Sequence, residues 1–410
     1  MQEKTKEPEI RFAGFTGAWE QRKLSDLCSM HARIGWQNLR TSEFLDQGQY
    51  LLITGTDFDN GSIRFNSCHF VKKERYDQDK NIQVKNGSIL ITKDGTLGKV
   101  AYVENLNKPA TLNAGVFNVK TKGNDVDNKY LFQYLKAPFL MKYVDEKSTG
   151  GTIKHLNQSI LVNFPVVLPG VEEQRKIGEF LSHIDSILTL HQRKYEKLLN
   201  IKKSMLEKMF PKEGEVVPEI RFKGFTGAWE QRKFSKLYKR SSEKNDGSIG
   251  IERNITVATM QFKSDIRLSS DDYLKTYFTF KVGDIAFEGH QSKEFRYGRF
   301  VENDIGDGIV SHIFTVFRPI QRFNLHFWKY AINSENLMQK ILSRSTKAST
   351  MMHDLVPEDF LNETFLVPSI DEQKAVGKFL HQIDNLLTLH QRKLEMLKNV
   401  KQAFLEKMFV

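Results

Sequence analysis

Residues 172–210 read EEQRKIGEFLSHIDSILTLHQRKYEKLLNIKKSMLEKMF, and residues 371–409 repeat them as DEQKAVGKFLHQIDNLLTLHQRKLEMLKNVKQAFLEKMF. In both copies the seam positions recur with the alternating four- and three-residue spacing of a heptad repeat. The first copy places there Ile177, Leu181, Ile184, Leu188, His191, Tyr195, Leu198, Lys202, Met205 and Met209. The second copy places there Val376, Leu380, Ile383, Leu387, His390, Leu394, Leu397, Lys401, Phe404 and Met408. Each copy is therefore predicted to be one long helix with a coiled-coil face.

Helix-start signals agree with this periodicity. Pro165 and Pro169 precede the first copy, whereas Pro368 precedes the second and is followed by Ser369 and Glu372 in capping-box spacing. A helix of about 38 residues is roughly 55 Å long, because each residue adds about 1.5 Å. Two such helices in one chain can bury their seams on each other, and an antiparallel pair would carry its attached segments at opposite ends. The polar seam residues are interpreted as fixing register rather than binding metal.

A second, shorter repeat sets the order of the chain. PEIRFAGFTGAWEQRK begins at Pro8 and PEIRFKGFTGAWEQRK begins at Pro218, and they differ only at Ala13 against Lys223. Trp19, Trp229, Phe12 and Phe222 of these flanks are expected to be packing anchors. The predicted division is flank 1–23, first body 24–170, first helix 171–210, linker with second flank 211–233, second body 234–368 and second helix 369–410. Near-identical flanks around divergent bodies indicate that the bodies carry specificity.

The two bodies share a faint common pattern. NGSILI from Asn86 corresponds to VGDIAF from Val282, and AGVFNVK from Ala114 corresponds to SHIFTVF from Ser311. An amphipathic helix is predicted near 129–144 in the first body and near 325–342 in the second. The predicted fold class is α+β: two mixed α/β bodies separated by two long antiparallel coiled-coil helices, with a pseudo-twofold internal repeat.

Composition favours a polyanionic partner inside a reducing compartment. The formal net charge is +11, and phosphates neutralised by Lys or Arg release counterions and add affinity, although a merely solvated basic surface remains an alternative. The two cysteines, Cys28 and Cys68, have no CxxC or Cys/His ligand spacing, so they are expected to be buried apolar residues. No apolar run is long enough to cross a bilayer, and Met1 to Pro8 is charged. A cytoplasmic location without membrane contact is expected.

Catalytic motifs are missing from the sequence. It contains no GxxxxGK[ST] phosphate loop, no Asn-Pro-Pro-aromatic or Asp-Pro-Pro-aromatic methyltransferase signature, and neither GxSxG nor HExxH. The chain is therefore expected to be non-catalytic and to hold neither a metal nor a cofactor of its own.

The openings EEQRKIGEFL…ID and DEQKAVGKFL…ID, the signals GSILITKDGTLGKVAYV and GDIAFEGH, and the two-body order resemble the specificity subunit of type I restriction-modification systems. The resemblance covers nearly the whole chain. It implies that each body is a target recognition domain reading one half of a bipartite, gapped site in double-stranded DNA. It also implies that the helices set the gap and dock two methyltransferase subunits, which bind S-adenosylmethionine and methylate adenine. Restriction/translocase subunits would join for cleavage.

Candidate DNA-binding residues follow from side-chain chemistry, because base edges and phosphates are read by Arg, Lys, Asn, Gln, Ser and Thr presented from loops. In the first body they are Arg33, Gln37, Lys93, Thr96, Lys99, Thr152 and Lys154. In the second they are Gln291, Lys293, Arg296, Arg299, Lys347, Ser349 and Thr350. About half are expected to touch DNA.

Two other readings of the sequence stay open. One is a stand-alone sequence-specific DNA-binding protein without methyltransferase partners, which copurification of a methyltransferase would exclude. The other is a coiled-coil scaffold whose basic charge is incidental, which predicts no sequence preference among random duplexes.

Overall fold

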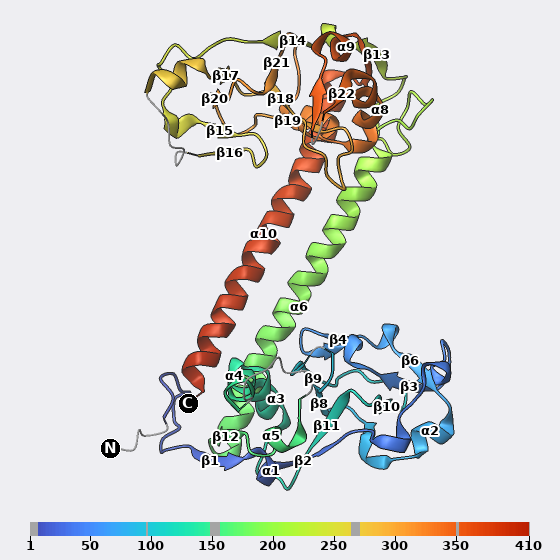
Figure 1. The fold of residues 1–410 in the computed structure, drawn as a ribbon, viewed down its shortest axis with the longest axis vertical. Coiled ribbons are helices and arrows are strands. Elements are labelled where there is room, and N and C mark those ends of the chain that lie inside the picture. The colour runs from blue at the N-terminus through green and yellow to red at the C-terminus, as the bar shows by residue number, and fades with distance from the viewer. Residues whose placement is uncertain (1–6, 96, 148–155, 264–270, 350–351, 410) are drawn as a thin grey trace. The chain divides into compact units, whose positions relative to one another are not determined.

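The computed structural model describes residues 7–95, 97–147, 156–263, 271–349 and 352–409 (Figure 1). The chain forms two compact units. Unit 1 consists of Met1–Gln192 and Lys393–Val410, and unit 2 consists of Arg193–Arg392. Each unit therefore contains one body and a part of both long helices.

The long helices are α6 (Val171–Lys208, 38 residues) and α10 (Ile370–Met408, 39 residues), and neither is interrupted. Within unit 1, the rings of Phe180 in α6 and Phe404 in α10 lie edge to face with centroids 4.9 Å apart. Five residues later in α6, Asp185 pairs with Lys401, which lies earlier in α10. The helix segments of unit 1 therefore run antiparallel, in agreement with the predicted fold class.

The central sheets repeat the same strand order in both units. Unit 1 has the antiparallel order β2-β11-β8-β9, and unit 2 has the antiparallel order β14-β21-β18-β19. The strands of unit 1 are β2 (Cys28–His31), β11 (Val116–Thr121), β8 (Ile89–Thr92) and β9 (Val100–Tyr102). Those of unit 2 are β14 (Tyr238–Ser241), β21 (Thr315–Pro319), β18 (Ile285–Glu288) and β19 (Arg299–Glu302). The common pattern of the two bodies is thereby confirmed.

Smaller separate sheets and short helices complete the two units. Unit 1 adds the sheet β6-β3-β10-β7, in which only β3 and β10 are parallel. Its remaining elements are α1 (Leu24–Leu27), β3 (Tyr50–Ile53), β4 (Phe58–Asp59), β5 (Ser62–Ile63), β6 (His69–Val71), α2 (Lys73–Asp77), β7 (Gln83–Val84), β10 (Ala110–Leu112) and α5 (Gln158–Leu161). Unit 2 adds β15 (Ile255–Thr256), β16 (Gln261–Phe262), β17 (Phe278–Phe280), β20 (Gly308–Val310), β22 (Thr346–Ala348), β23 (His353–Leu355) and α9 (Pro357–Asn362).

The repeated flanks tie each body to the start of a long helix. β1 (Glu20–Lys23) pairs with β12 (Pro165–Leu168), and β13 (Glu230–Lys233) pairs with β24 (Thr364–Val367). Trp19 and Trp229 are both buried, which confirms them as packing anchors. The ring of Phe12 lies edge to face with Phe180, as that of Phe222 does with Phe379.

The capping box predicted at the second helix is only half formed. Ser369 Oγ accepts a hydrogen bond from Glu372 N at 3.3 Å. The Glu372 carboxylate does not return to the cap, because Arg221 of the flank donates to both of its oxygens at 2.7 Å. Arg11 binds Glu173 in the same way at 2.8 and 2.9 Å, so this ion pair is part of the repeat.

The amphipathic segment of each body is two helices, so the prediction of a single helix was wrong. In unit 1, α3 (Asn128–Lys136) ends before Ala137, and α4 (Pro138–Lys147) begins at a proline. A proline disfavours helical backbone in the preceding residue, and Ala137 is accordingly extended. In unit 2, α7 (Leu325–Ile332) and α8 (Glu335–Ser345) are separated by Asn333 and by Ser334, whose backbone is extended.

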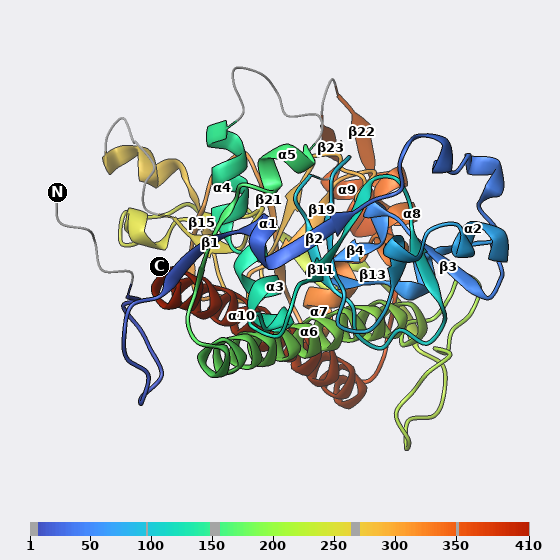
Figure 2. The same cartoon turned by 90° about the horizontal axis from the view of Figure 1, so that it is seen from below.

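Short helices pack closely on the long ones (Figure 2). A Cβ atom added at Gly178 of α6 would lie 2.7 Å from Tyr130 N of α3. At Gly377 of α10 it would lie 2.6 Å from Phe327 N of α7. Glycine at both positions therefore permits the backbone approach that seats each body on its helix.

The last residues of each helix repeat complete a hydrophobic core. Phe409 contacts Tyr130 and Tyr134 in unit 1, with ring centroids 5.4 and 5.2 Å apart. Phe210 takes the same role in unit 2, where its ring lies 5.5 Å from that of Phe327. The core of unit 1 thus combines residues from both ends of the sequence.

Candidate nucleic-acid interface

Each unit brings two loop segments together just beyond its central strand. In unit 1, Lys93 follows β8, and its carbonyl accepts a hydrogen bond of 2.8 Å from Leu156 N. In unit 2, Gly289 follows β18, and its carbonyl accepts a hydrogen bond of 2.8 Å from His353 N. Leu156 and His353, each more than 60 residues further along the chain, are therefore bonded at equivalent places of the repeated fold. Thr96, Thr152, Lys154 and Thr350 lie outside the described residues.

The β8–β9 turn of unit 1 carries Lys93 and Lys99. Lys93 is half-buried, with Nζ 5.5 Å from the centre of the Phe117 ring, whereas Lys99 is exposed. Gly98 has a φ of +69° and lies against α4, where an added Cβ would be 2.1 Å from Met141 Sδ. Glycine at position 98 therefore lets the turn pack closely against α4. Lys99, the next residue, is exposed to solvent.

Arg33 does not present its charge to solvent, which corrects its assignment as a DNA contact. Its side chain has no exposed surface. The guanidinium donates to Leu112 O, Gln37 O, Arg75 O, Gln78 Oε1 and Thr111 Oγ1 at 2.9–3.3 Å. These bonds satisfy every guanidinium nitrogen, so we assign Arg33 to holding the first body together.

Gln37 has little free surface either. It closes the short turn Gly35–Gln37, and its side chain is 9 % exposed. A residue with so little surface can contact a base only if the turn rearranges.

The candidates of unit 2 between 289 and 299 form one exposed loop. Gln291, Lys293 and Arg296 are exposed. Gln291 Nε2 lies 2.5 Å from His353 Nε2, and the Arg296 guanidinium lies 5.5 Å from the centre of the Tyr297 ring. An added Cβ at Gly289 would come within 2.1 Å of His353 O, so the loop and the β22–β23 hairpin are in tight contact.

Arg299 is less exposed than the candidate residues of the β22–β23 hairpin. Arg299 is half-buried and donates to Glu288 Oε2 at 2.7 Å and to Ala258 O at 2.9 Å. Its charge is therefore partly compensated. Lys347 and Ser349 are exposed, with Ser349 Oγ donating to Met352 O at 3.0 Å.

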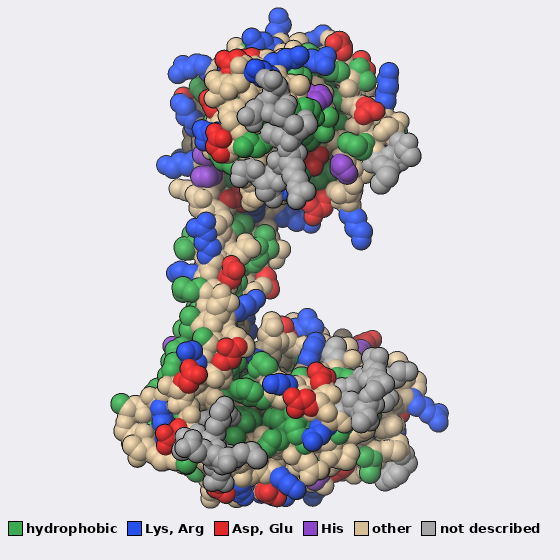
Figure 3. All heavy atoms as spheres, turned by 60° about the vertical axis from the view of Figure 1, so that its left-hand side comes forward, with side chains coloured by type: hydrophobic (Ala, Val, Ile, Leu, Met, Phe, Trp, Pro, Cys, Tyr) green, Lys and Arg blue, Asp and Glu red, His purple; other side chains and the backbone are tan. Residues whose placement is uncertain are grey.

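Sequence reasoning missed the residue that joins these segments. His353 is 8 % exposed and contacts Gln291, Tyr297 and Thr346. The signal was present in STKASTMMH, where this histidine follows the polar candidates. Figure 3 shows Lys and Arg side chains interspersed with acidic ones on the face in view, so charge alone does not outline the interface.

The loops and the repeat define a class of protein: one that presents two different sets of polar and basic loop side chains on two copies of one scaffold. Residues 17–200 match the family described as type I restriction modification DNA specificity domain. The MjaVIII specificity subunit of Methanocaldococcus jannaschii is 24% identical over 342 residues, 80% of this chain and 79% of that protein. The MjaIX specificity subunit of the same organism is 22% identical over 345 residues, 78% of this chain and 76% of that protein.

A solved structure shares the fold over nearly the full length. The type I restriction-modification S subunit from M. genitalium superposes with a TM-score of 0.64 at 14% identity, covering 98% of this chain and 99% of that chain. The chain is thus similar in sequence to type I restriction enzyme specificity subunits, and it shares the fold of one solved S subunit. None of the described helices is apolar over a length that could cross a membrane.

Proposed function

We propose that the chain reads a bipartite, gapped site in double-stranded DNA, one half with each unit. The observation that carries this proposal is the repeated loop pair: β8 and β18 end at equivalent places, and a second segment is hydrogen-bonded to each. The scaffold is the same but the side chains differ, with Lys93 and Lys99 in unit 1 against Gln291, Lys293 and Arg296 in unit 2. Two unlike surfaces on one repeated scaffold suit two unlike half-sites.

The proposed docking of two methyltransferase subunits uses the outer faces of the long helices. Several apolar side chains outside the seam positions of these helices are exposed to solvent. They are Leu190 and Leu199 of α6, and Leu386, Leu389, Met396 and Val400 of α10. Met396 is 57 % exposed. Exposed apolar side chains at helical spacing favour burial against a partner helix.

Methyl transfer and cleavage belong to the partners in this proposal. The methyltransferase subunits bind S-adenosylmethionine and modify adenine in the cytoplasm, and restriction/translocase subunits join them. The isolated chain then neither binds S-adenosylmethionine nor methylates DNA. Methyl transfer by the purified chain alone would overturn the division of labour.

A domain exchange tests the reading of half-sites. Residues 24–165 are replaced by the first body of another family member, and methylated adenines are mapped in a host that also expresses the methyltransferase. One half of the site should change while the other persists. If both halves change, the units are not independent readers. If the chain never copurifies with a methyltransferase, it is a stand-alone DNA-binding protein.

A further inference from the structure

Unit 1 has a pocket lined by three lysines at the end of β8 opposite to the Lys93 turn. The pocket measures about 470 Å³. Lys80, Lys85 and Lys120 line it together with Ser88 and Asn128. Lys80 and Lys85 are exposed and Lys120 is half-buried, so ions from solution can reach the three ammonium groups. No Asp or Glu is among the described residues that line it.

The walls of this pocket are held by hydrogen bonds within unit 1. Ser88 Oγ accepts from Lys85 N at 3.1 Å, which fixes the turn before β8. Lys120 Nζ donates to Lys80 O at 3.3 Å, and Asn128 Nδ2 donates to Gly87 O at 3.0 Å. The three lysines therefore lie on two backbone segments, residues 80–88 and strand β11, that hydrogen bonds connect to each other and to Asn128.

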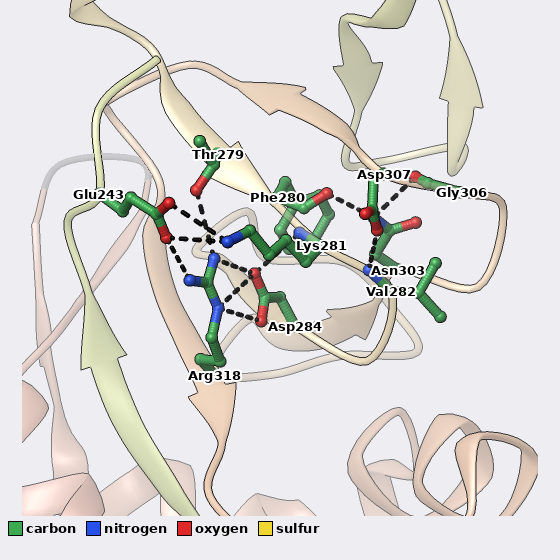
Figure 4. Close-up of polar contacts among 10 residues, drawn as sticks. All are labelled: Glu243, Thr279, Phe280, Lys281, Val282, Asp284, Asn303, Gly306, Asp307 and Arg318. Atoms are coloured by element: carbon green, nitrogen blue, oxygen red, sulfur yellow. Dashed lines mark hydrogen bonds and ion pairs between the residues drawn. The ribbon is translucent and has the colours of Figure 1, made fainter. Parts of the chain in front are cut away.

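At the equivalent site of unit 2, the basic side chains form ion pairs with carboxylates of the same unit (Figure 4). Lys281 and Arg318 stand at the positions of Lys85 and Lys120, and Asp284 stands at the position of Ser88. Asp284 Oδ2 accepts from Lys281 N at 2.8 Å, as Ser88 Oγ does from Lys85 N. Unlike serine, Asp284 also pairs with Arg318, at 2.9 Å.

A second carboxylate completes the balance in unit 2. Glu243 forms ion pairs with both Arg318 and Lys281. The hydrogen bond from Arg318, with that from Lys281, lowers the pKa of Glu243 to about 2, so the carboxylate is ionised at neutral pH. In unit 1, the position equivalent to Glu243 is occupied by Arg33, whose side chain is buried in the first body. Two cations thus pair with two carboxylates in unit 2, whereas no carboxylate is among the described residues that line the three-lysine pocket of unit 1.

We propose that the Lys80–Lys85–Lys120 pocket of unit 1 binds a phosphate group. An anion between the three ammonium groups replaces the counter-charge that Asp284 and Glu243 supply in unit 2, and phosphate oxygens accept hydrogen bonds from lysine. The Ser88 hydroxyl and the Asn128 amide are further polar groups in the wall. The phosphate comes either from the DNA backbone or from a free phosphate ester. This site is independent of the proposed reading loops, because it lies at the other end of β8.

Calorimetric unfolding of the full chain in inorganic phosphate and in chloride, at equal ionic strength, tests the pocket. Phosphate at about ten times its Kd should raise the Tm of unit 1 by about 3–6 °C. Ser88→Asp, which supplies the carboxylate found in unit 2, and Lys85→Gln/Lys120→Gln should both abolish the rise. Lys142→Gln, an exposed lysine of the same unit outside the pocket, controls for general salt effects and should keep it. An equal rise in all four proteins, or none in the wild type, overturns the proposal.

The salt dependence of binding to a nonspecific duplex separates the two sources. Each neutralised phosphate contributes about −0.9 to the slope of log K against log salt. If the DNA backbone fills the pocket, Ser88→Asp should make the slope about one unit less negative while Lys142→Gln leaves it unchanged. If the slope stays constant although the phosphate-dependent rise in Tm is lost, a free phosphate ester is the ligand. Half-site specificity should persist in both cases, so this test can fail without affecting the proposed reading function.

Discussion

Lys401 Nζ lies 2.6 Å from Asp185 Oδ1 and ties the last part of α10 to α6 within unit 1. Unit 2 contains the same pair between Lys202 and Asp384, also at 2.6 Å. The two differ in burial, because the Lys401 side chain is 8 % exposed and that of Lys202 is 27 % exposed. Both lysines occupy seam positions, so each lysine of the seam meets an aspartate of the other helix.

This difference in burial predicts unequal effects of removing the aspartates. Asp185→Ala leaves Lys401 buried and unpaired and should cost unit 1 about 3 kcal/mol. Asp384→Ala leaves the more exposed Lys202 and should cost unit 2 about 1 kcal/mol. Hydrogen exchange resolved by segment can measure both losses in otherwise intact chains. Equal losses would show that burial does not set the strength of the pair.

Phe409, which follows α10, should be needed for the stability of the first body, although the two are far apart in sequence. Phe409→Ala removes the ring packed on Tyr130 and Tyr134 and should destabilise unit 1 by about 3–5 kcal/mol, the usual cost for a buried phenylalanine. Phe210→Ala is the matched variant, which should destabilise unit 2 instead. Limited proteolysis of the two variants should therefore expose different bodies, and a shared pattern would contradict the assignment.

The two cysteines should be unreactive in the folded chain. Cys28 and Cys68 are buried, as the sequence predicted, and burial raises the pKa of each thiol to about 12. At pH 8 the reactive thiolate would then be about 10⁻⁴ of each population. Iodoacetamide should label neither cysteine at pH 8 in native buffer and both in denaturant. Rapid labelling of either in native buffer would contradict this expectation.

The loop pair of unit 2 should depend on a single close contact. Gly289→Ala places a methyl group 2.1 Å from His353 O, so the loop and the hairpin must separate. We expect loss of methylation that depends on one half-site, with the fold of unit 1 unchanged. Gly170→Ala, where a Cβ meets nothing within 4 Å, is the control and should keep the specificity. Wild-type specificity in Gly289→Ala would remove this loop pair from the proposed interface.

The long helices should set the distance between the half-sites. One heptad adds about 10 Å of helix, and DNA rises about 3.4 Å per base pair. Matched heptad insertions after Leu190 and Leu389 keep both seams in phase and should lengthen the gap by up to about three base pairs. Activity can fall, because about three base pairs also turn the second half-site by roughly a quarter turn. A constant gap with high activity would show that helix length does not position the units.

Local periodicity explains what the sequence could predict. The seams of α6 and α10, the flank anchors Trp19 and Trp229 and the shared strand order depend on patterns within short segments. The break before Pro138 was also readable, because proline marks a probable helix end. The burial of Arg33 was not readable, since its hydrogen-bond partners come from two distant segments, around Gln78 and Leu112, that meet it only in the folded body. The charge balance of Asp284 and Glu243 likewise depends on strand pairing.

The packing of Phe409 in unit 1 has a consequence for synthesis on the ribosome. Residues 393–409 follow all of Arg193–Arg392 in chain order, so the first body emerges long before the segment that closes its core. Unit 2 is complete as soon as its own continuous stretch, Arg193–Arg392, has emerged. Unit 1 is complete only after residues 393–409 have emerged as well. The body made first is thus the last to mature, and the nascent chain leaves the apolar surface around Tyr130 and Tyr134 uncovered until translation of α10 is finished.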